Sequence, residues 1–375
     1  MVTESIALSA YAREIAPTDI LDPTDLRPVL LGLYGEVGGI MSAAKKHKRD
    51  PASFPGYERA AREEFGDALW YLAALCRRLS IDLEGLFAEA SSGDGYRLVS
   101  IASDLAGGAC ASAFLPTSTA DLDARLFKLG RSAAALLVSK PERTMLVGLA
   151  SDYLEALHGT GLSFANVVRF NLAKARGAFL EPNSTQLRDF DADFDSEEQL
   201  PRAFAIRVSQ RPSGKTYLQW NGVFVGDPLT DNIGDPDGYR FHDVFHLANA
   251  AVLHWSPVMR ALIKHKRKSK PSYDEAQDGG RAIVVEEGVT AWIFSQAKEL
   301  DFFDNQKSVS LGLLKSIGDF VKGFEVDTCP LKLWERSILQ GYEVFRNIRK
   351  AEGGWIVGNR EERTVTYKPP EWRPM

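Results

Sequence analysis

Near the N-terminus of this 375-residue chain, carboxylates stand in two otherwise apolar runs with helical periodicity. The run GLYGEVGGI carries Glu36, and the run EEFGDALWYLAAL carries Glu63, Glu64 and Asp67. Glu64 and Asp67 are three residues apart and Glu63 and Asp67 are four apart, so on a helix they share a face. Carboxylates gathered at a packed helix boundary raise one another's pKa unless a cation lies among them. Hard oxygen donors of this kind suit Mg²⁺, which takes its other ligands from water and substrate phosphates.

The two runs resemble the all-α nucleoside triphosphate pyrophosphohydrolases of the MazG-like superfamily, in which an E-x-x-E helix precedes an E-x-x-D helix. Glu64 and Asp67 match the E-x-x-D pattern, and Glu36 matches the first position of E-x-x-E. Gly39 stands where many members have the second Glu. Either Glu63 compensates for that carboxylate, or one metal ion binds weakly. The alternative to a metal site is a solvated, charged face on an amphipathic helix.

The resemblance implies hydrolysis of a nucleoside triphosphate to the monophosphate and pyrophosphate, with Mg²⁺, or Mn²⁺ in its place, as cofactor. It makes Glu36, Glu64 and Asp67 the metal ligands, with Glu36, Glu63 and Glu64 as the catalytic carboxylates. Among these, Glu63 is the group expected to orient or deprotonate the attacking water. A second class of function stays open, because Gly39 departs from the family pattern. In that class the protein is a nucleotide-binding sensor with weak or no turnover.

Two further segments offer residues for binding the substrate. GLSFANVVRFNLAKARGAF resembles the closing helix of the family, on which Asn171 and Lys174 would present a donor and a cation to a triphosphate. The alternative is an ordinary basic end of a helix. Lys45 and Lys46 follow the Glu36 run. They either bind phosphate oxygens or are only the charged C-terminal end of that helix.

Aromatic residues follow the second carboxylate run directly. Trp70 and Tyr71 are candidates for stacking on the nucleotide base, and they fit equally well as core residues.

The C-terminal half has a polar cluster of its own. In YRFHDVFHLANAAVLHW, His242 and His246 are four residues apart with Asp243 beside them, a spacing that can chelate one metal ion. Glu286 and Glu287 interrupt another apolar helical run. These five residues predict a second ligand-binding or catalytic site, whose metal, if any, is unknown. The alternative is a buried hydrogen-bonded network that only fixes two helices.

Two motifs in this half, YRFHD-x-FH and QDGGRA, resemble the C-terminal domain that accompanies some MazG-like proteins. That resemblance carries no activity. The basic run KHKRKSK (264–270) either faces a phosphate-bearing ligand or forms a solvated loop.

Taken together, the patterns predict a mainly α protein of two domains. Residues 1–180 form a MazG-like all-α domain with a helical insertion at about 95–149. Residues 181–202 form a polar, acidic linker. Residues 203–375 form a mostly helical domain with a few short β-strands.

The first domain contains a weak internal sequence similarity, called the internal echo below. YLEALHGTGLSF resembles YLAALCRRLSIDL, and Leu146 and Leu149 occupy the positions that match Glu64 and Asp67. The echo is either a degenerate second repeat or a chance likeness between amphipathic helices.

The composition of the chain limits the kinds of partner and the cellular location that we expect for it. A net charge of −5 gives no basic footprint for duplex nucleic acid. The chain has no apolar run long enough to span a membrane and no signal-peptide pattern, and its three cysteines are scattered, so we expect a cytoplasmic protein. Because a two-helix carboxylate site needs other helices to close it, and the resembling superfamily usually obtains them by oligomerisation, we expect a homodimer or higher homo-oligomer.

Overall fold

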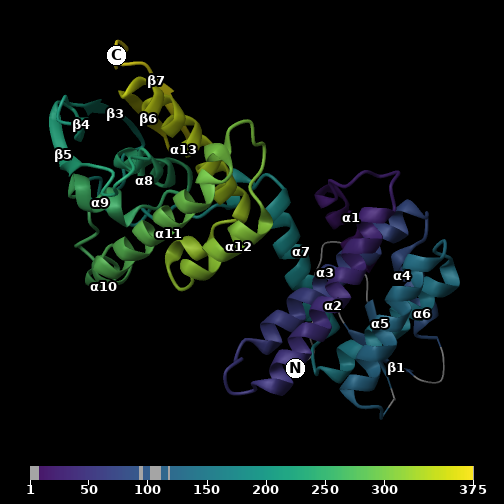
Figure 1. Ribbon diagram of the computed structural model, residues 1–375. Helices are drawn as coiled ribbons and strands as arrows, with labels where there is room; N and C mark the ends of the chain where they lie inside the picture. Colours follow the sequence, from purple (N-terminus) through teal and green to yellow (C-terminus); the bar gives the residue numbers. More distant parts are fainter. Residues whose placement is uncertain (1–7, 93–95, 102–110, 117–118, 375) are drawn as a thin grey trace. The chain divides into compact units, whose positions relative to one another are not determined.

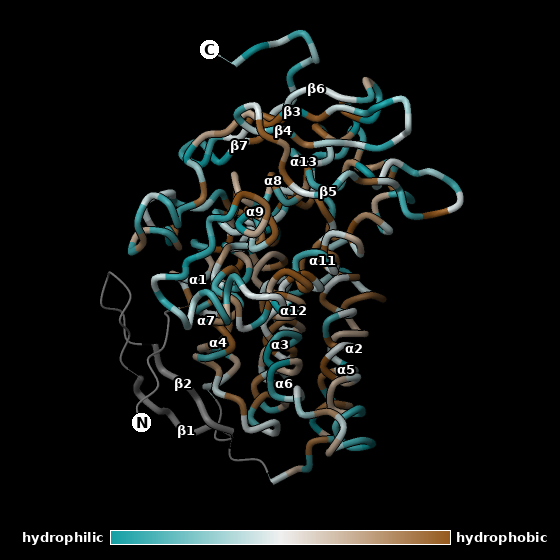
Figure 2. Tube along the Cα trace, turned by 90° about the vertical axis from the view of Figure 1, so that its left-hand side faces the viewer, coloured by the Kyte–Doolittle hydropathy of each residue, from teal (hydrophilic) through white to brown (hydrophobic). Residues whose placement is uncertain are grey.

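The computed structural model describes residues 8–92, 96–101, 111–116 and 119–374, and it is mainly α-helical (Figure 1). The chain divides into two compact units, Met1–Leu180 and Glu181–Met375. Each unit has its own hydrophobic core. Along the helices of both units hydrophobic and hydrophilic residues alternate, as expected where one face of each helix is buried (Figure 2).

The described part of the first unit is built from paired helices. α2 packs along α3, and α5 packs along α6. α2 also contacts α5, α4 contacts α6, and α7 lies against α3 and α1. The helices are α1 (Leu8–Ile15), α2 (Arg27–Arg49), α3 (Tyr57–Arg78), α4 (Leu83–Ala90), α5 (Leu122–Val138), α6 (Arg143–Gly159) and α7 (Phe164–Phe179).

Local sequence explains where several of these helices begin and what they bury. Asp82 and Asp121 cap α4 and α5, because each carboxylate accepts the backbone N–H of the residue three positions on. On α3 the apolar stripe is buried as its spacing predicts, and includes Phe65, Leu69 and Leu72. The carboxylates of α3 therefore lie on the remaining, partly exposed face.

The segment predicted to be a helical insertion differs in its first part. β1 (Tyr96–Ile101) and β2 (Ala111–Pro116) form an antiparallel pair, so the first unit is not all-α. The β1 sequence YRLVSI is rich in aromatic and β-branched residues, which favour strands. Within the predicted range of 95–149, residues 95, 102–110 and 117–118 lie outside the described residues. The later part is helical, since it contains α5 and the beginning of α6.

The internal echo corresponds to two similar arrangements of helices. α3 is followed by a short turn and α4, and α6 is followed by a short turn and α7. Each of α3 and α6 also packs against the helix that precedes it in its pair. Leu146 and Leu149 are fully buried. The α5–α6 pair therefore places leucines in the core at the positions where α3 carries carboxylates.

The second unit combines helices with one antiparallel sheet of order β5-β4-β3-β6-β7. The strands are β3 (Ala203–Gln210), β4 (Thr216–Trp220), β5 (Val223–Leu229), β6 (Gly353–Asn359) and β7 (Thr364–Lys368). The pairing of β3 with β6 joins the hairpins from the two ends of the unit into that sheet.

Two helices of this unit, α8 and α13, pack on each other and contact β6 and β7 (Figure 1). The helices are α8 (Asp243–Val252), α9 (Pro257–Ile263), α10 (Pro271–Ala276), α11 (Gly280–Lys298), α12 (Leu311–Phe320) and α13 (Leu331–Ala351). A 3₁₀ turn, η3 (Tyr239–Phe241), leads directly into α8.

The predicted linker at 181–202 is instead a folded part of the second unit. Phe190 and Leu200 belong to the core of this unit, and Phe194 is also buried. Asp191 is buried and accepts the backbone N–H of Leu200 at 2.8 Å. The segment lacks helical periodicity, as the sequence indicated, but its aromatic residues anchor it. Among the residues described here, no helix is long and apolar enough to cross a membrane.

Candidate functional sites

The carboxylates of the first unit gather between α2, α3 and α7. The Lys174 ammonium of α7 lies 2.9 Å from Glu63 Oε1 and also pairs with the Asp67 carboxylate. Asn171, one turn earlier on α7, donates from Nδ2 to Asp67 Oδ1 at 3.1 Å. The structure therefore brings Glu63, Asp67, Asn171 and Lys174 together from segments about a hundred residues apart.

Glu36 on α2 completes this acidic cluster. Burial, the nearby Asp67 carboxylate and a hydrogen bond with Glu64 raise the pKa of Glu36 to about 8, against a smaller opposing effect of Lys174. Near neutral pH, and with no other cation among these groups, Glu36 carries a proton that it shares with Glu64. Repulsion among these carboxylates is therefore not fully relieved at Glu36.

Gly39 makes room for one of these carboxylates. A Cβ at Gly39 would lie 2.0 Å from Glu64 Oε2, so the Glu64 carboxylate occupies the space where residue 39 would have a side chain. Many MazG-like sequences have their second Glu at this position. Here a carboxylate from α3 fills the space that the missing α2 side chain leaves.

Tyr11 is a residue of this cluster that sequence reasoning missed. Its buried hydroxyl donates to Asn171 Oδ1 at 2.6 Å, which fixes the Asn171 amide so that Nδ2 points at Asp67. Tyr11 lies in a short helix with no pattern linked to the carboxylate runs, so no signal in the sequence was available to find it.

Trp70 and Tyr71 make contacts that hold α3 against its neighbours. The Trp70 indole N–H donates to Thr18 Oγ1 at 2.8 Å. The Tyr71 ring lies over Gly32 of α2, where an added Cβ would come within 2.2 Å of it. Tyr71 is also near the acidic cluster, since burial and the Glu36 and Asp67 charges raise the pKa of its hydroxyl.

Lys45 and Lys46 are exposed near the end of α2. Lys45 lines a surface hollow of about 680 Å³ between α2 and α5, together with Lys48 and Phe127. Because Lys45 is nine residues after Glu36, helical geometry places it on the opposite side of α2. The hollow and its cations therefore lie away from the carboxylates.

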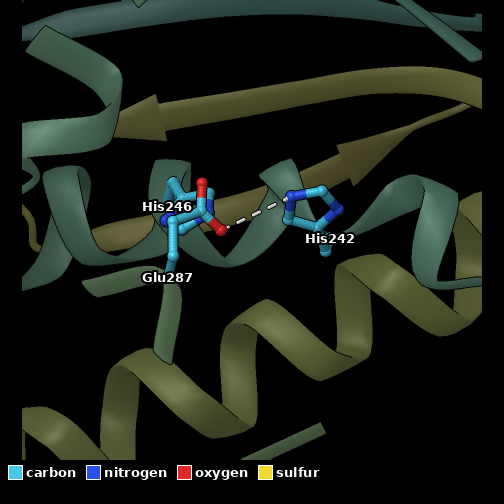
Figure 3. Close-up of side chains that lie close together, drawn as sticks. All are labelled: His242, His246 and Glu287. Atoms are coloured by element: carbon cyan, nitrogen blue, oxygen red, sulfur yellow. Dashed lines mark ion pairs between the residues drawn. The ribbon is translucent and has the colours of Figure 1, made fainter. Parts of the chain in front are cut away.

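The second unit brings three side chains of its predicted site to one point, shown in Figure 3. His242 lies at the start of α8, His246 is one turn later, and Glu287 reaches them from α11. Glu287 Oε2 lies 3.4 Å from His246 Nε2 and 3.8 Å from His242 Nε2. Of the described His, Cys, Asp and Glu residues, these are the three whose possible ligand atoms lie within 4.8 Å of one another.

Glu286 plays a different part from its neighbour Glu287. It is buried, and its carboxylate lies 3.0 Å from His246 Nδ1 and accepts hydrogen bonds from the Ser256 hydroxyl at 2.8 Å and the Val258 N–H at 2.9 Å. These contacts fix the orientation of the His246 ring. Ser256 also caps α9, so the structure explains a residue that the sequence pattern did not connect to the site.

Electrostatics at this cluster follow from burial and from the two glutamates. Burial by itself would lower the pKa of His246. The Glu286 and Glu287 carboxylates have a larger, opposite effect, so the pKa of His246 is raised from its ordinary value to about 10. Burial raises the pKa of Asp243, which lies beside His242 with Oδ1 at 3.8 Å from Nε2. Burial opposes ionisation of Glu287 too, yet its contacts with His246 and His242 hold its pKa below the ordinary value.

The second unit corresponds closely to a known domain. Residues 185–371, about half of the chain, match the model of the MazG C-terminal domain. The chain is a MazG-like protein. The match confirms the resemblance carried by the YRFHD and QDGGRA segments, and it points to a nucleotide-related function. No curated protein and no solved structure matches the chain significantly.

The QDGGRA segment of this MazG-like protein serves its fold. Asp278 accepts both Nε and Nη2 of the fully buried Arg267, at 3.0 and 2.6 Å, and Glu325 pairs with Arg267 at 2.6 Å. Gly279 lies so close to the Glu275 backbone that an added Cβ would be 2.2 Å from its carbonyl oxygen. The basic run KHKRKSK is therefore not entirely a solvated loop, because its central arginine belongs to a buried ion-pair network.

Proposed function

We propose that the first unit hydrolyses a nucleoside triphosphate to the monophosphate and pyrophosphate with Mg²⁺. The observation that carries the proposal is the gathering of Glu36, Glu63, Glu64 and Asp67, all half-buried, beside the Lys174 ammonium group. Carboxylates that lie so close together favour binding of a divalent cation and of the phosphates that accompany it. The match to the MazG C-terminal domain supports a nucleotide substrate.

The donor set fits Mg²⁺. All of the candidate ligands are carboxylate oxygens, the donors that Mg²⁺ prefers, and burial and the neighbouring carboxylates raise the pKa of Glu36 to about 8. We propose that Glu36, Glu64 and Asp67 hold the ion. When bound, Mg²⁺ would neutralise charge on the phosphate oxygens and hold the triphosphate in place.

The remaining polar residues then have separate roles. Glu63 lies at the edge of the cluster and would accept a proton from the water that attacks the α-phosphorus. Lys174 would turn from Asp67 towards the phosphates, since its ammonium group is a mobile cation at the end of a flexible side chain. Asn171 would stay in place because Tyr11 fixes its amide.

A nucleotide-binding sensor is the second candidate. The contact of Glu64 with Gly39 favours it, because the site has one carboxylate fewer on α2 than the E-x-x-E pattern supplies. A sensor would bind the nucleotide and Mg²⁺ without releasing pyrophosphate, and the second unit would provide the output.

The test is to incubate the full-length protein with Mg²⁺ and a panel of ribonucleoside and deoxyribonucleoside triphosphates. Phosphorus NMR distinguishes the monophosphate and pyrophosphate from a diphosphate and phosphate. In ¹⁸O-labelled water, attack on the α-phosphorus places the label in the monophosphate. We expect pyrophosphate from at least one nucleotide and the label in the monophosphate.

Variants of α3 provide the controls. Glu64→Gln should abolish turnover, whereas Glu58→Gln, at an exposed position in the first turn of the same helix, should leave it unchanged. Tight nucleotide binding without turnover by the unsubstituted protein would support the sensor. No binding and no turnover with any nucleotide would overturn both proposals.

We also propose that the protein is a homodimer and is cytoplasmic. Exposed apolar side chains on α2 and α5, including Leu31, Phe127 and Val138, offer surface for a second copy. Small-angle scattering should give a mass of two chains, and a single-chain mass at every concentration would contradict the dimer. The cytoplasmic location rests on sequence composition.

A further inference from the structure

We propose that His242, His246 and Glu287 of the second unit bind one divalent transition-metal ion, separately from the Mg²⁺ site proposed for the first unit. The two histidines come from successive turns at the start of α8, and the carboxylate comes from α11 (Figure 3). The donor set of two imidazoles and one carboxylate is typical of zinc and of other first-row metals.

The distances fit a metal better than they fit hydrogen bonds. In a tetrahedral zinc site with bonds of about 2.1 Å, neighbouring donor atoms are about 3.4 Å apart. Glu287 Oε2 is 3.4 Å from His246 Nε2 and 3.8 Å from His242 Nε2. Hydrogen bonds between such groups would be about 2.7–3.0 Å long. The three donor atoms lie within 4.8 Å of one another, close enough for a single ion to contact all of them.

Each histidine ring makes a contact through Nδ1 that turns its other nitrogen, Nε2, towards the proposed metal site. His242 Nδ1 lies 2.9 Å from the Tyr239 carbonyl oxygen, and because a carbonyl only accepts, Nδ1 carries the proton. His246 Nδ1 likewise faces the Glu286 carboxylate at 3.0 Å. Each Nε2 is thus directed to the site, as in the carboxylate–histidine–metal arrangement of known metal centres.

His246 Nε2 supplies an independent observation. The His246 side chain is fully buried, and among the described residues Nε2 makes no hydrogen bond of good geometry; it faces Glu287 Oε2 at 3.4 Å, an ion-pair distance. A buried polar atom that lacks a good hydrogen bond costs about 1–3 kcal/mol, and a metal ion between Nε2 and Oε2 would satisfy both atoms. The atom is aimed at the point that His242 and Glu287 also face.

The site is accessible on one side. The Glu287 side chain is 40 % exposed, whereas that of His242 is 12 % exposed. An ion can therefore enter past Glu287 while the histidines remain fixed. Three protein donors leave one position of a tetrahedral ion for water or for an atom of a ligand, in contrast to a closed structural zinc site with four protein donors.

The test measures metal directly and does not depend on nucleotide hydrolysis. The full-length protein is stripped with a chelator, dialysed, and titrated separately with Zn²⁺, Co²⁺, Mn²⁺ and Fe²⁺. Bound metal is counted by mass spectrometry, and the visible spectrum of Co²⁺ reports tetrahedral coordination by nitrogen and oxygen. We expect one ion per chain for at least one of these metals.

Variants at the accessible edge keep the test independent of folding in the core. His242→Gln and Glu287→Gln should each weaken binding at least 10-fold and change the Co²⁺ spectrum. Glu299→Gln, an exposed carboxylate at the end of α11, and His47→Gln, an exposed histidine of the first unit, should bind metal as the unsubstituted protein does. Binding of none of the four metals, or equal binding by His242→Gln and Glu287→Gln, would overturn the proposal and leave a hydrogen-bonded network.

Discussion

The acidic cluster of the first unit is half-buried and the Arg267 network of the second is fully buried, and the two also differ in how their carboxylates are paired. In the network, Asp278 and Glu325 each pair with the planar guanidinium of Arg267, and Asp191 pairs with Arg260. Such fork-shaped pairs satisfy both partners.

In the acidic cluster, Lys174 is the ammonium group shared by Glu63 and Asp67. Burial and the nearby Asp67 and Glu64 carboxylates raise the pKa of Glu36. The comparison teaches that burial of charge is by itself a poor sign of function, whereas a carboxyl group whose pKa is raised by burial and by neighbouring carboxylates is a better one.

The largest effect should come from breaking the Arg267 network. Asp278→Asn would leave the buried Arg267 charge with Glu325 at 2.6 Å and Asp191 at 3.9 Å as carboxylate partners, and loss of one partner of a buried pair costs about 3–5 kcal/mol. We expect the free energy of unfolding of the second unit, measured with urea, to fall by that amount. Glu361→Gln, which removes an exposed pair with Arg202, should change it little. A small loss in Asp278→Asn would mean that the network contributes less than its burial indicates.

The acidic cluster should respond in the opposite way. Asp67→Asn removes one of several repelling carboxylates, so we expect the free energy of unfolding to stay the same or rise. Hydrolysis should nevertheless fall roughly 100-fold or more, by analogy with the loss of one group that stabilises transition-state charge. Steady-state kinetics and urea unfolding on the same preparation test both parts. A variant that loses stability while keeping its activity would show that Asp67 is a structural partner of Lys174.

The cation-rich edge of the network should make stability depend on pH. Burial and the Arg360 and Arg363 charges lower the pKa of His254 to about 4, below its ordinary value of about 6.5. Between these pH values the unfolded chain binds a proton that the folded chain does not. His254 therefore contributes its full stabilisation above about pH 6.5, and the contribution is lost as the pH falls through about 4, on the order of 3 kcal/mol in all.

The control for this prediction is His254→Asn, because Asn tolerates the positive φ of 61° at this position. Urea unfolding at several pH values should show a shallower loss of stability in the variant. The same slope in both proteins would mean that other groups cause the acid sensitivity.

The smallest effect is expected at Gly39. Gly39→Ala should raise stability by up to about 1 kcal/mol, because Ala favours a helix. Its Cβ would displace the Glu64 carboxylate, so activity should fall severalfold. Gly35→Ala on the same helix, where an added Cβ meets no atom within 4 Å, should give the stability gain without the loss of activity. Full activity in Gly39→Ala would show that the position of Glu64 in this structure is not the active one.

Periodicity allowed much of the fold to be predicted. The apolar stripe of α3 marks a long helix with one buried face, and the almost wholly apolar sequence of α8 marks a short helix that is buried on all sides; both helices form where expected. The β1–β2 pair was missed because a short run of mixed apolar residues fits a helix or a strand. The segment at 181–202 was assigned as a linker because its acidic residues concealed the spaced Phe190 and Phe194 that anchor it.

The sites were only partly predictable for a similar reason. Spacing on one helix brings His242 and His246 together, so that pair was visible in the sequence. The different roles of Glu286 and Glu287 depend on which of two adjacent side chains faces the Ser256 hydroxyl, which only the tertiary structure reveals. Arg267 was hidden in a basic run, because its partners Asp278 and Glu325 are 11 and 58 residues away.

The contact between Gly39 and Glu64 also limits how this protein can evolve. A mutation that restored a glutamate at position 39 would place its side chain where the Glu64 carboxylate now lies. A lineage could add a carboxylate at position 39 to the four now present only after Glu64 had first moved or shortened. Such an intermediate would carry a weakened site before any benefit appeared, so the present arrangement should persist in the descendants of this sequence.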